Sequence, residues 1–243
     1  MKVTILGTGS PEAQPILFTK DKGKSRLRPS LLIQKKGKTL LFDASPDIRQ
    51  QLLHVQAKKL DAVFLTHYHF DHFWGVGDLH QLSYVNKAQF PVYANKDVLQ
   101  HIEKHLPWLD LNLKPIQKTT HIKDLKITSF DVKHAPYLKT TGYAIQSQGK
   151  RAIYVPDILD LDENAKKICK QANLIIADGQ YFFGKYIDDE THADGNKIKP
   201  LLQSLKPKQV WLLAYSNHWY GSLKEKTLPE NFSYPNDFDQ TTL

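Results

Sequence analysis

The sequence predicts an α/β (α+β) protein, folded as a four-layer αββα sandwich in one domain that covers residues 1–243. Short apolar strands come in groups interleaved with helices, a pattern typical of two sheets with helices on their outer faces. The 243 residues suffice for one core that needs no covalent staples. Several strands end at a His or an Asp, which indicates that the scaffold positions chemistry at its strand ends.

The first elements are a short apolar strand at residues 2–6 and the Gly-Thr-Gly-Ser turn that follows it. Residues 19–29 are polar and basic, so we expect an exposed loop. Strands at 31–34 and 39–43 flank a Lys-Lys-Gly-Lys turn. Pro46 then opens a helix, because proline fits the first helical turn. The apolar side of this helix carries Ile48, Leu52 and Leu53.

The later elements follow from periodicity and turn composition. The expected strands are residues 61–66, 91–93, 126–132, 142–146, 151–155, 174–177 and 209–214. The expected helices are residues 96–105, 161–170 and 196–205. A hairpin turn at Gln148-Gly149-Lys150 joins two of these strands. The strand ends supply five candidate functional residues: Asp43, His67, His134, Asp157 and Asp178.

Composition limits the chemistry that these residues can support. The single cysteine, Cys169, excludes a disulfide framework and a thiolate-rich zinc site, whereas 11 histidines leave imidazole ligands in good supply. Apolar runs are too short to span a bilayer, so we expect a soluble, cytoplasmic protein with no membrane partner. The net charge of +8 fits either a lysine-rich soluble chain or an anionic substrate.

The strongest motif is His67-Tyr68-His69-Phe70-Asp71-His72, which places four potential metal ligands within six residues after an apolar strand. Imidazole and carboxylate groups suit Zn or Mn ions. A tight loop can point His67 and His69 to one side and Asp71 and His72 to the other, which favours two adjacent ions. The alternative, a loop of solvated histidines, does not account for this spacing.

The motif His67-x-His69-x-Asp71-His72 resembles the signature of the metallo-β-lactamase superfamily, and the resemblance extends over nearly the whole chain. It implies the αββα sandwich of the metallo-β-lactamase fold. Different segments of this chain resemble two branches of the superfamily. The motif with residues 76–78 and 91–93 resembles phosphoribosyl cyclic phosphate phosphodiesterase. Residues 44–52 and 174–190 resemble the pyrroloquinoline quinone biosynthesis B protein, and ribonuclease Z is similar more distantly.

The resemblance implies a metal ligand at each matching position. The implied ligands are His67, His69 and His134 for the first ion, Asp71 and His72 for the second, and Asp157 as the bridge between them. Two of these positions have an alternative. A lone histidine such as His134 is more often structural, and Asp157 could cap the helix that follows it.

Asp71 and His192 are the residues that we expect to act in catalysis. His192 matches a mobile-loop histidine that acts on the leaving group, and an imidazole pKa near neutrality suits proton donation. An ordinary loop histidine is the alternative. We expect Asp43 and Asp178 to orient ligand histidines by hydrogen bonds. The nearby aromatic residues could line the pocket rim or pack inside the fold: Phe70, Phe73 and Trp74.

The chain departs from the family pattern after its last core strand. The superfamily places a His ligand there, whereas this sequence has Tyr215, with His218 three residues later. Either His218 completes the second metal site or Tyr215 leaves that site weakened. The second ion is therefore less secure than the first.

Motif and resemblance together predict a hydrolase that cleaves a phosphodiester, a small cyclic or nucleotide-like phosphate ester, by attack of a metal-bound hydroxide. Its cofactors would be two divalent metal ions, Zn or Mn. A small phosphorylated substrate is the expected partner, and a homodimer is left open.

Other functions stay open. An RNA-processing nuclease of the ribonuclease Z kind would use basic residues between Lys20 and Arg28, although a long insertion that could grip tRNA is missing. A cofactor-biosynthesis role of the pyrroloquinoline quinone type and a metal-binding module without catalysis are further alternatives. Lactam hydrolysis is disfavoured, because fold does not fix substrate.

Overall fold

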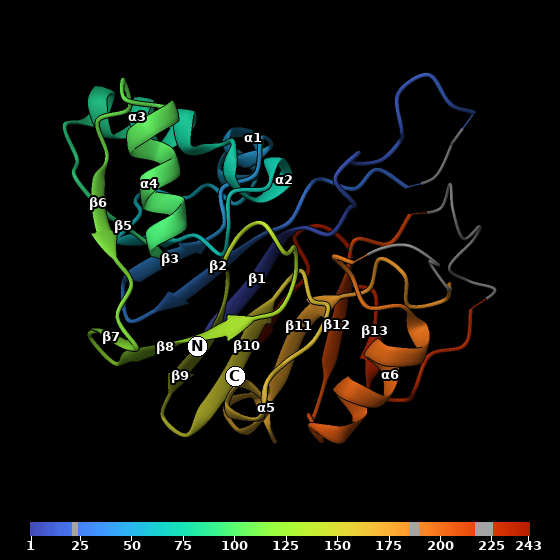
Figure 1. The fold of residues 1–243 in the computed structure, drawn as a ribbon. Coiled ribbons are helices and arrows are strands. Elements are labelled where there is room, and N and C mark those ends of the chain that lie inside the picture. The colour runs from blue at the N-terminus through green and yellow to red at the C-terminus, as the bar shows by residue number, and fades with distance from the viewer. Residues whose placement is uncertain (21–23, 185–189, 217–225) are drawn as a thin grey trace.

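The computed structural model describes residues 1–20, 24–184, 190–216 and 226–243. Among these residues, two seven-stranded sheets pack face to face and helices cover their outer faces (Figure 1). The four-layer αββα sandwich predicted from the sequence is confirmed. None of the described helices has both the length and the apolar character that crossing a membrane requires.

The first sheet has the strand order β14-β1-β2-β3-β4-β5-β6. Its strands are β1 (Lys2–Gly7), β2 (Ser30–Lys35), β3 (Lys38–Phe42), β4 (Ala62–Phe64), β5 (Pro91–Ala94), β6 (Asn112–Pro115) and β14 (Gln240–Thr242). Pairing is antiparallel from β14 to β3 and parallel from β3 to β6. The carboxyl ends of β1, β3 and β4 therefore lie at the same edge.

The second sheet has the order β13-β12-β11-β10-β9-β8-β7. Its strands are β7 (Thr119–Ile122), β8 (Leu125–Val132), β9 (Thr140–Ser147), β10 (Lys150–Val155), β11 (Leu174–Asp178), β12 (Val210–Leu213) and β13 (Phe232–Ser233). Pairing is antiparallel from β7 to β10 and parallel from β10 to β13. The carboxyl ends of β8, β10, β11 and β12 thus share one edge.

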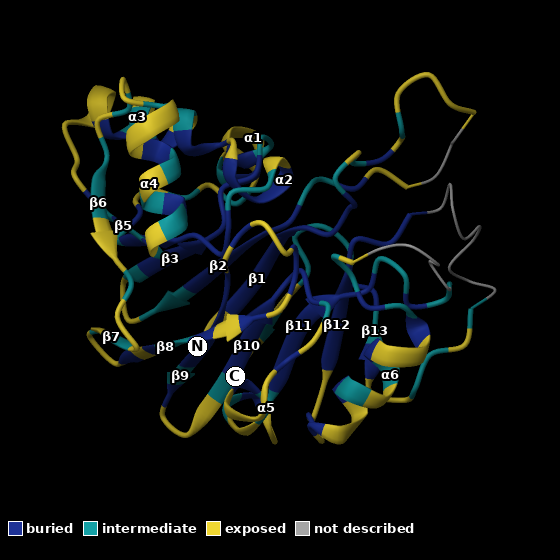
Figure 2. Cartoon of the chain, in the orientation of Figure 1, coloured by how far each residue is buried: buried dark blue, intermediate teal, exposed yellow. Residues whose placement is uncertain are grey.

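Helices cover both outer faces. Those on the first sheet are α1 (Ile48–His54), α2 (Phe70–Phe73), α3 (Val76–Asn86) and α4 (Lys96–His105). Those on the second sheet are α5 (Glu163–Cys169) and α6 (Gly195–Ser204). Three apolar cores separate the four layers, one between the sheets and one under each set of helices. Figure 2 shows the strands buried and the outer turns of the helices exposed.

The two sheets are joined at the edge where the candidate residues lie. The Thr141 amide of the second sheet donates to the Thr66 carbonyl at the end of β4, at 3.0 Å. The Tyr143 hydroxyl donates to the Leu65 carbonyl at 2.7 Å. On the other side, the Ala214 amide donates to the Thr8 carbonyl at 2.9 Å. These bonds hold the strand ends of both sheets in register around one site.

Two expectations about the N-terminal region were wrong. The helix begins at Ile48 rather than at Pro46, and Leu53 is 61% exposed. The buried partner of Ile48 is Gln51, whose amide donates to the Arg28 carbonyl. The basic loop is not exposed throughout, because the Arg26 side chain is buried.

Candidate metal centre

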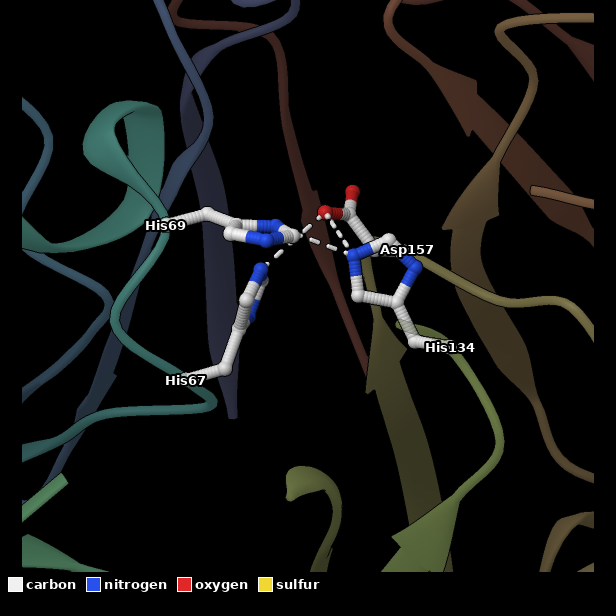
Figure 3. Close-up of side chains that lie close together, drawn as sticks. All are labelled: His67, His69, His134 and Asp157. Atoms are coloured by element: carbon white, nitrogen blue, oxygen red, sulfur yellow. Dashed lines mark hydrogen bonds and ion pairs between the residues drawn. The ribbon is translucent and has the colours of Figure 1, made fainter. Parts of the chain in front are cut away.

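The candidate ligands come from both sheets and meet between them. His67 follows β4, and His69 is the N-cap of α2. From the second sheet, His134 follows β8, and Asp157 follows β10. Figure 3 shows the two pairs pointing toward one another from opposite sides. The sandwich thus places side chains that are up to 90 residues apart in sequence within contact distance.

One group of side chains has the geometry of a metal site. One ligand atom each from His67, His69, His134 and Asp157 lies within 4.8 Å of all the others. Asp157 Oδ2 is 3.2 Å from His67 Nε2 and 3.4 Å from His134 Nε2. His134 Nε2 is also 3.1 Å from His69 Nδ1. Three imidazoles and a carboxylate are a donor set that suits Zn.

A second group shares the same carboxylate oxygen. His72 Nε2 is 3.3 Å from Asp157 Oδ2 and 3.1 Å from Asp71 Oδ2. Asp71 and His72 lie in α2 and are both buried. The structure therefore brings the predicted bridging residue between the two predicted ligand groups. The assignment of each residue as a ligand stays a prediction.

Asp43 orients His72 directly and His67 through Thr66, on the side of each ring that faces away from the candidate metal site. His72 Nδ1 is 2.9 Å from Asp43 Oδ2, and the Thr66 hydroxyl donates to the same oxygen at 3.0 Å. The Thr66 oxygen is then left to accept from His67 Nδ1, 2.8 Å away. Both rings consequently carry their Nδ1 proton on the outside and turn Nε2 toward the site.

His134 and His69 are held in the same manner by other partners. His134 Nδ1 lies 2.6 Å from the Thr191 carbonyl, which can only accept a hydrogen bond. His69 Nε2 is 2.8 Å from the Tyr137 hydroxyl, so its Nδ1 is the nitrogen that faces the site. Each of the four imidazoles thus has one nitrogen tied outside and one directed inward, as histidine ligands require.

Two candidate ligands have protonation states that favour metal binding, whereas the carboxylates around His72 favour its protonated form. Burial lowers the pKa of His67 to about 3 and that of His69 to about 4, so both rings are neutral at pH 7 and offer a lone pair. Burial also opposes a charge on His72, but the Asp157 and Asp71 carboxylates outweigh it and raise the pKa of His72 well above its usual range. Burial alone would raise the pKa of Asp157. The charge on His72 and the contact with His67 outweigh burial and hold this pKa well below its usual range.

The site fits divalent cations. Among the described residues, His67 Nε2 and His72 Nε2 are buried without a hydrogen-bond partner, although both lie close to Asp157. A buried polar atom with no partner costs about 1–3 kcal/mol. A cation between these nitrogens and the Asp157 carboxylate would give both rings a partner, and at His72 it would replace the ring proton.

His192 lies next to this centre. Its Nδ1 is 2.5 Å from Asp178 Oδ2, and its ring centroid is 4.8 Å from that of His134. One ligand atom each from His192, Asp178 and Asp157 lies within 4.8 Å of the other two. His192 and Asp178 are therefore brought to the site, where Asp178 contacts His192 rather than a predicted metal ligand, and the catalytic role of His192 stays a prediction.

The end of β12 differs from the other strand ends. Tyr215 is buried, and its carbonyl accepts from Gln14 Nε2 at 2.9 Å. Its ring packs on Tyr234, with centroids 4.8 Å apart. His218 lies outside the described residues. Its part in the second metal site therefore stays a prediction.

Some contacts at the site were not predicted from the sequence. Thr66, Tyr137 and Thr191 each hold a candidate ligand, and no spacing rule marks them. The alternative that Asp157 caps a helix was wrong, because α5 is capped by Asp162 Oδ1, which accepts from the Ala165 amide at 2.7 Å.

A cavity of about 610 Å³ opens beside His134. It lies between the segment that follows β8 and the start of α6. Its lining includes three exposed lysines: Lys133, Lys139 and Lys197. Asp131 and Glu190 also line it, so the ionised groups among the described lining residues are mixed in sign.

Comparisons with known proteins agree with this geometry. Residues 38–215 match the family described as the beta-lactamase superfamily domain. An octanoyltransferase from Porphyromonas gingivalis is 31% identical over 238 residues, which are 90% of this chain and 46% of that protein. A ribonuclease Z from Thermococcus gammatolerans is 25% identical over 170 residues, 65% of this chain and 51% of that protein. The chain thus spans about half the length of these relatives.

Two solved structures share the fold. A diphosphatase from the PhnP family superposes with a TM-score of 0.86 at 23% identity, over 99% of this chain and 97% of that one. Zinc-bound PqqB from Methylobacterium extorquens superposes with a TM-score of 0.81 at 20% identity, over 100% of both chains. At these identities the similarity shows the fold alone.

Proposed function

Because this chain belongs to the beta-lactamase superfamily domain family, and the match includes the candidate metal centre, we propose that it is a metal-dependent hydrolase that cleaves a phosphodiester. The proposed substrate is a small cyclic or nucleotide-like phosphate ester. The observation that carries this proposal is the convergence of three imidazole nitrogens from both sheets on Asp157 Oδ2.

Two groups of residues would hold the ions. His67, His69, His134 and Asp157 form one, and Asp71, His72 and Asp157 form the other. Zn and Mn both suit such donors. When bound, divalent ions neutralise charge on phosphoryl oxygens and lower the pKa of bound water to about 7. Asp157 would fix the distance between the two positions.

His192 would move a proton at the leaving oxygen. Its Nδ1 is engaged by Asp178, so Nε2 is the nitrogen that would deliver the proton. The Asp178 carboxylate would hold the ring in that orientation and stabilise its charged form. The lysines beside His134 would attract an anionic substrate.

The names of similar proteins support a phosphate ester more than an acyl group. A ribonuclease, whose substrate is a phosphodiester, is among them. The octanoyltransferase is about twice as long as the region it shares with this chain, so its name does not tell which half carries that activity.

Ribonuclease Z-like cleavage of RNA is the second candidate, favoured by the ribonuclease Z relative. Two arginines of the basic segment that was expected to contact RNA are already buried or paired in the structure. Arg26 is buried, and Arg28 pairs with Asp47 at 3.2 Å. Binding of tRNA across a salt series distinguishes the two functions, because a nuclease that contacts many phosphates gives a steep salt dependence.

The direct test is hydrolysis of bis(p-nitrophenyl) phosphate by metal-loaded protein. We expect His67→Ala and Asp157→Ala to abolish turnover and to lower the metal content. His121→Ala, at an exposed position on β7, is the matched control and should retain both. Retained activity in either site variant would refute the assigned roles.

A further inference from the structure

Two aromatic side chains are exposed directly beside the candidate metal centre. Phe70 is 49% exposed and Trp74 is 56% exposed, whereas Phe73 between them is fully buried. The Phe70 and Trp74 rings lie 6.2 Å apart at an interplanar angle of 50°. Large aromatic side chains usually bury most of their surface. This pair instead leaves ring surface open to solvent.

The pair is joined to the metal centre by the geometry of α2. Phe70 stands between His69 and Asp71 in sequence, and α2 turns Asp71 inward, where it is buried. Residues four apart lie on the same face of a helical turn, so Phe70 and Trp74 share the outward face. Phe70 follows one candidate ligand and precedes another along the chain, which places the exposed pair at the border of the candidate metal centre.

Arg28 holds Phe70 in place. Its Cζ lies 5.2 Å from the Phe70 ring centroid. The guanidinium itself is fixed by Asp47 at 3.2 Å and by the Pro11 carbonyl, which accepts from Nε at 2.6 Å. One face of Phe70 is thus covered by an anchored cation, and about half of the residue stays exposed. The Phe70 ring therefore has a fixed orientation in the protein without a ligand.

We propose that Phe70 and Trp74, backed by Arg28, form a stacking surface for the base of a nucleotide-like phosphodiester. The inference rests on the proposed phosphodiesterase function and adds the chemical class of one ester substituent. Stacking suits this surface because every nucleobase offers a flat π face. Two side chains are too small a surface for a stable protein partner, which buries about 800 Å² on each side.

The first test measures binding and does not depend on hydrolysis. Adenosine 5′-monophosphate and ribose 5-phosphate carry the same phosphate and sugar but differ in the base. We expect the metal-loaded wild type to bind the adenosine compound about 10-fold more tightly by calorimetry, and Trp74→Ala to remove most of that ratio. Trp108→Ala, at another exposed tryptophan, is the matched control and should keep the full ratio.

The second test uses turnover of two five-membered cyclic phosphodiesters. Trp74→Ala should raise KM for adenosine 2′,3′-cyclic phosphate about 10-fold, and leave kcat and the KM for propane-1,2-diol cyclic phosphate unchanged. Trp74→Phe keeps a π surface and should restore most of the difference. If neither diester is hydrolysed, the proposed function fails, whereas the binding ratio still tests the stacking surface.

Two outcomes overturn the inference. They are equal binding of the two monophosphates by wild type, and an unchanged ratio in Trp74→Ala, with or without a change in the oligomeric state of that variant. An unchanged ratio with a changed oligomeric state would make the aromatic pair an interface between protein chains.

Discussion

Asp43 is the residue on which two candidate ligands depend. Its Oδ2 lies within hydrogen-bond distance of His72 Nδ1, the Thr66 hydroxyl and the Tyr154 hydroxyl. Its backbone φ is 60°, in the left-handed region that residues other than glycine rarely adopt. A non-glycine residue in that region costs on the order of 1–3 kcal/mol and persists only where its surroundings enforce it. The hydrogen bonds at this carboxylate provide that enforcement.

Asp43→Asn should weaken metal binding about 10- to 100-fold. Asparagine tolerates a positive φ, so the backbone stays unstrained, but its NH₂ group cannot accept the protons of His72 and Thr66. Competition with a zinc-binding dye measures the affinity. Asp61→Asn is the matched control. Asp61 lies before β4, at the end opposite His67, where it binds the Thr39 amide and Lys38. Equal affinity in both variants would show that Asp43 does not position the ligands.

Cys169 is a residue that burial keeps chemically unreactive. The residue is fully buried, and burial raises the pKa of its thiol to about 12. At pH 8 only about one thiol in 10,000 would be ionised, and the thiolate is the reactive form. We expect no reaction of the native protein with Ellman's reagent within minutes, and one thiol per chain in 6 M guanidinium chloride. Rapid native labelling would show that this thiol is accessible.

At the scale of elements, two glycines in open surroundings allow the effect of backbone conformation on stability to be measured apart from the effect of packing. A Cβ built on Gly149 or on Gly77 would meet nothing within 4 Å. Gly149 has a φ of +73° in the β9–β10 turn, whereas Gly77 lies in α3. Gly149→Ala should lower the free energy of unfolding by about 1–2 kcal/mol, because alanine resists that φ. Gly77→Ala should raise it by about 0.4–1 kcal/mol.

Urea unfolding of both variants measures these changes, and the sign of each is the decisive result. Equal destabilisation by the two substitutions would mean that hidden contacts, rather than φ, control both positions.

The elements also show where sequence patterns succeed and fail. The helix at residues 96–105 was predicted with the observed bounds, because Asn95 caps it and its apolar face is periodic. On the predicted apolar side of α1, Ile48 and Leu52 pack in the core as expected, but Gln51 is buried in place of Leu53. Gln51 gains a hydrogen bond to the Arg28 carbonyl, a contact between segments that no local pattern contains. α3 and the edge strands β6 and β7 were not predicted at all.

At the scale of the whole molecule, the metal centre is predictable only in part from spacing. His67 to His72 form one compact motif, so their proximity follows from the sequence. The meeting of His134 and Asp157 with that motif depends on how two sheets pack. Their places at strand ends made them candidates, and their roles beside the motif were expected from the resemblance. The outer contacts of the ligands, such as the Thr191 carbonyl on His134, exist only in the folded chain.

The same packing makes the metal centre a junction between the sheets, and this leads to a prediction about stability. His67 and His69 extend from the first sheet and His134 and Asp157 from the second, so an ion bound by these residues would link both halves of the sandwich. An ion present at 100 times its Kd stabilises the folded state by about 2.7 kcal/mol. For a chain of this size that corresponds to about 5–10 °C in Tm.

Removing the metal with a chelator should therefore lower Tm by that amount, and added zinc should restore it. Asp157→Ala is the informative variant. It removes the carboxylate that both ligand groups share, so zinc should no longer shift its Tm. His121→Ala should respond to zinc as the wild type does, because an exposed histidine on β7 touches neither group. A shift below about 1 °C, in wild-type protein that elemental analysis shows to have lost its metal, would mean that the ion does not join the sheets.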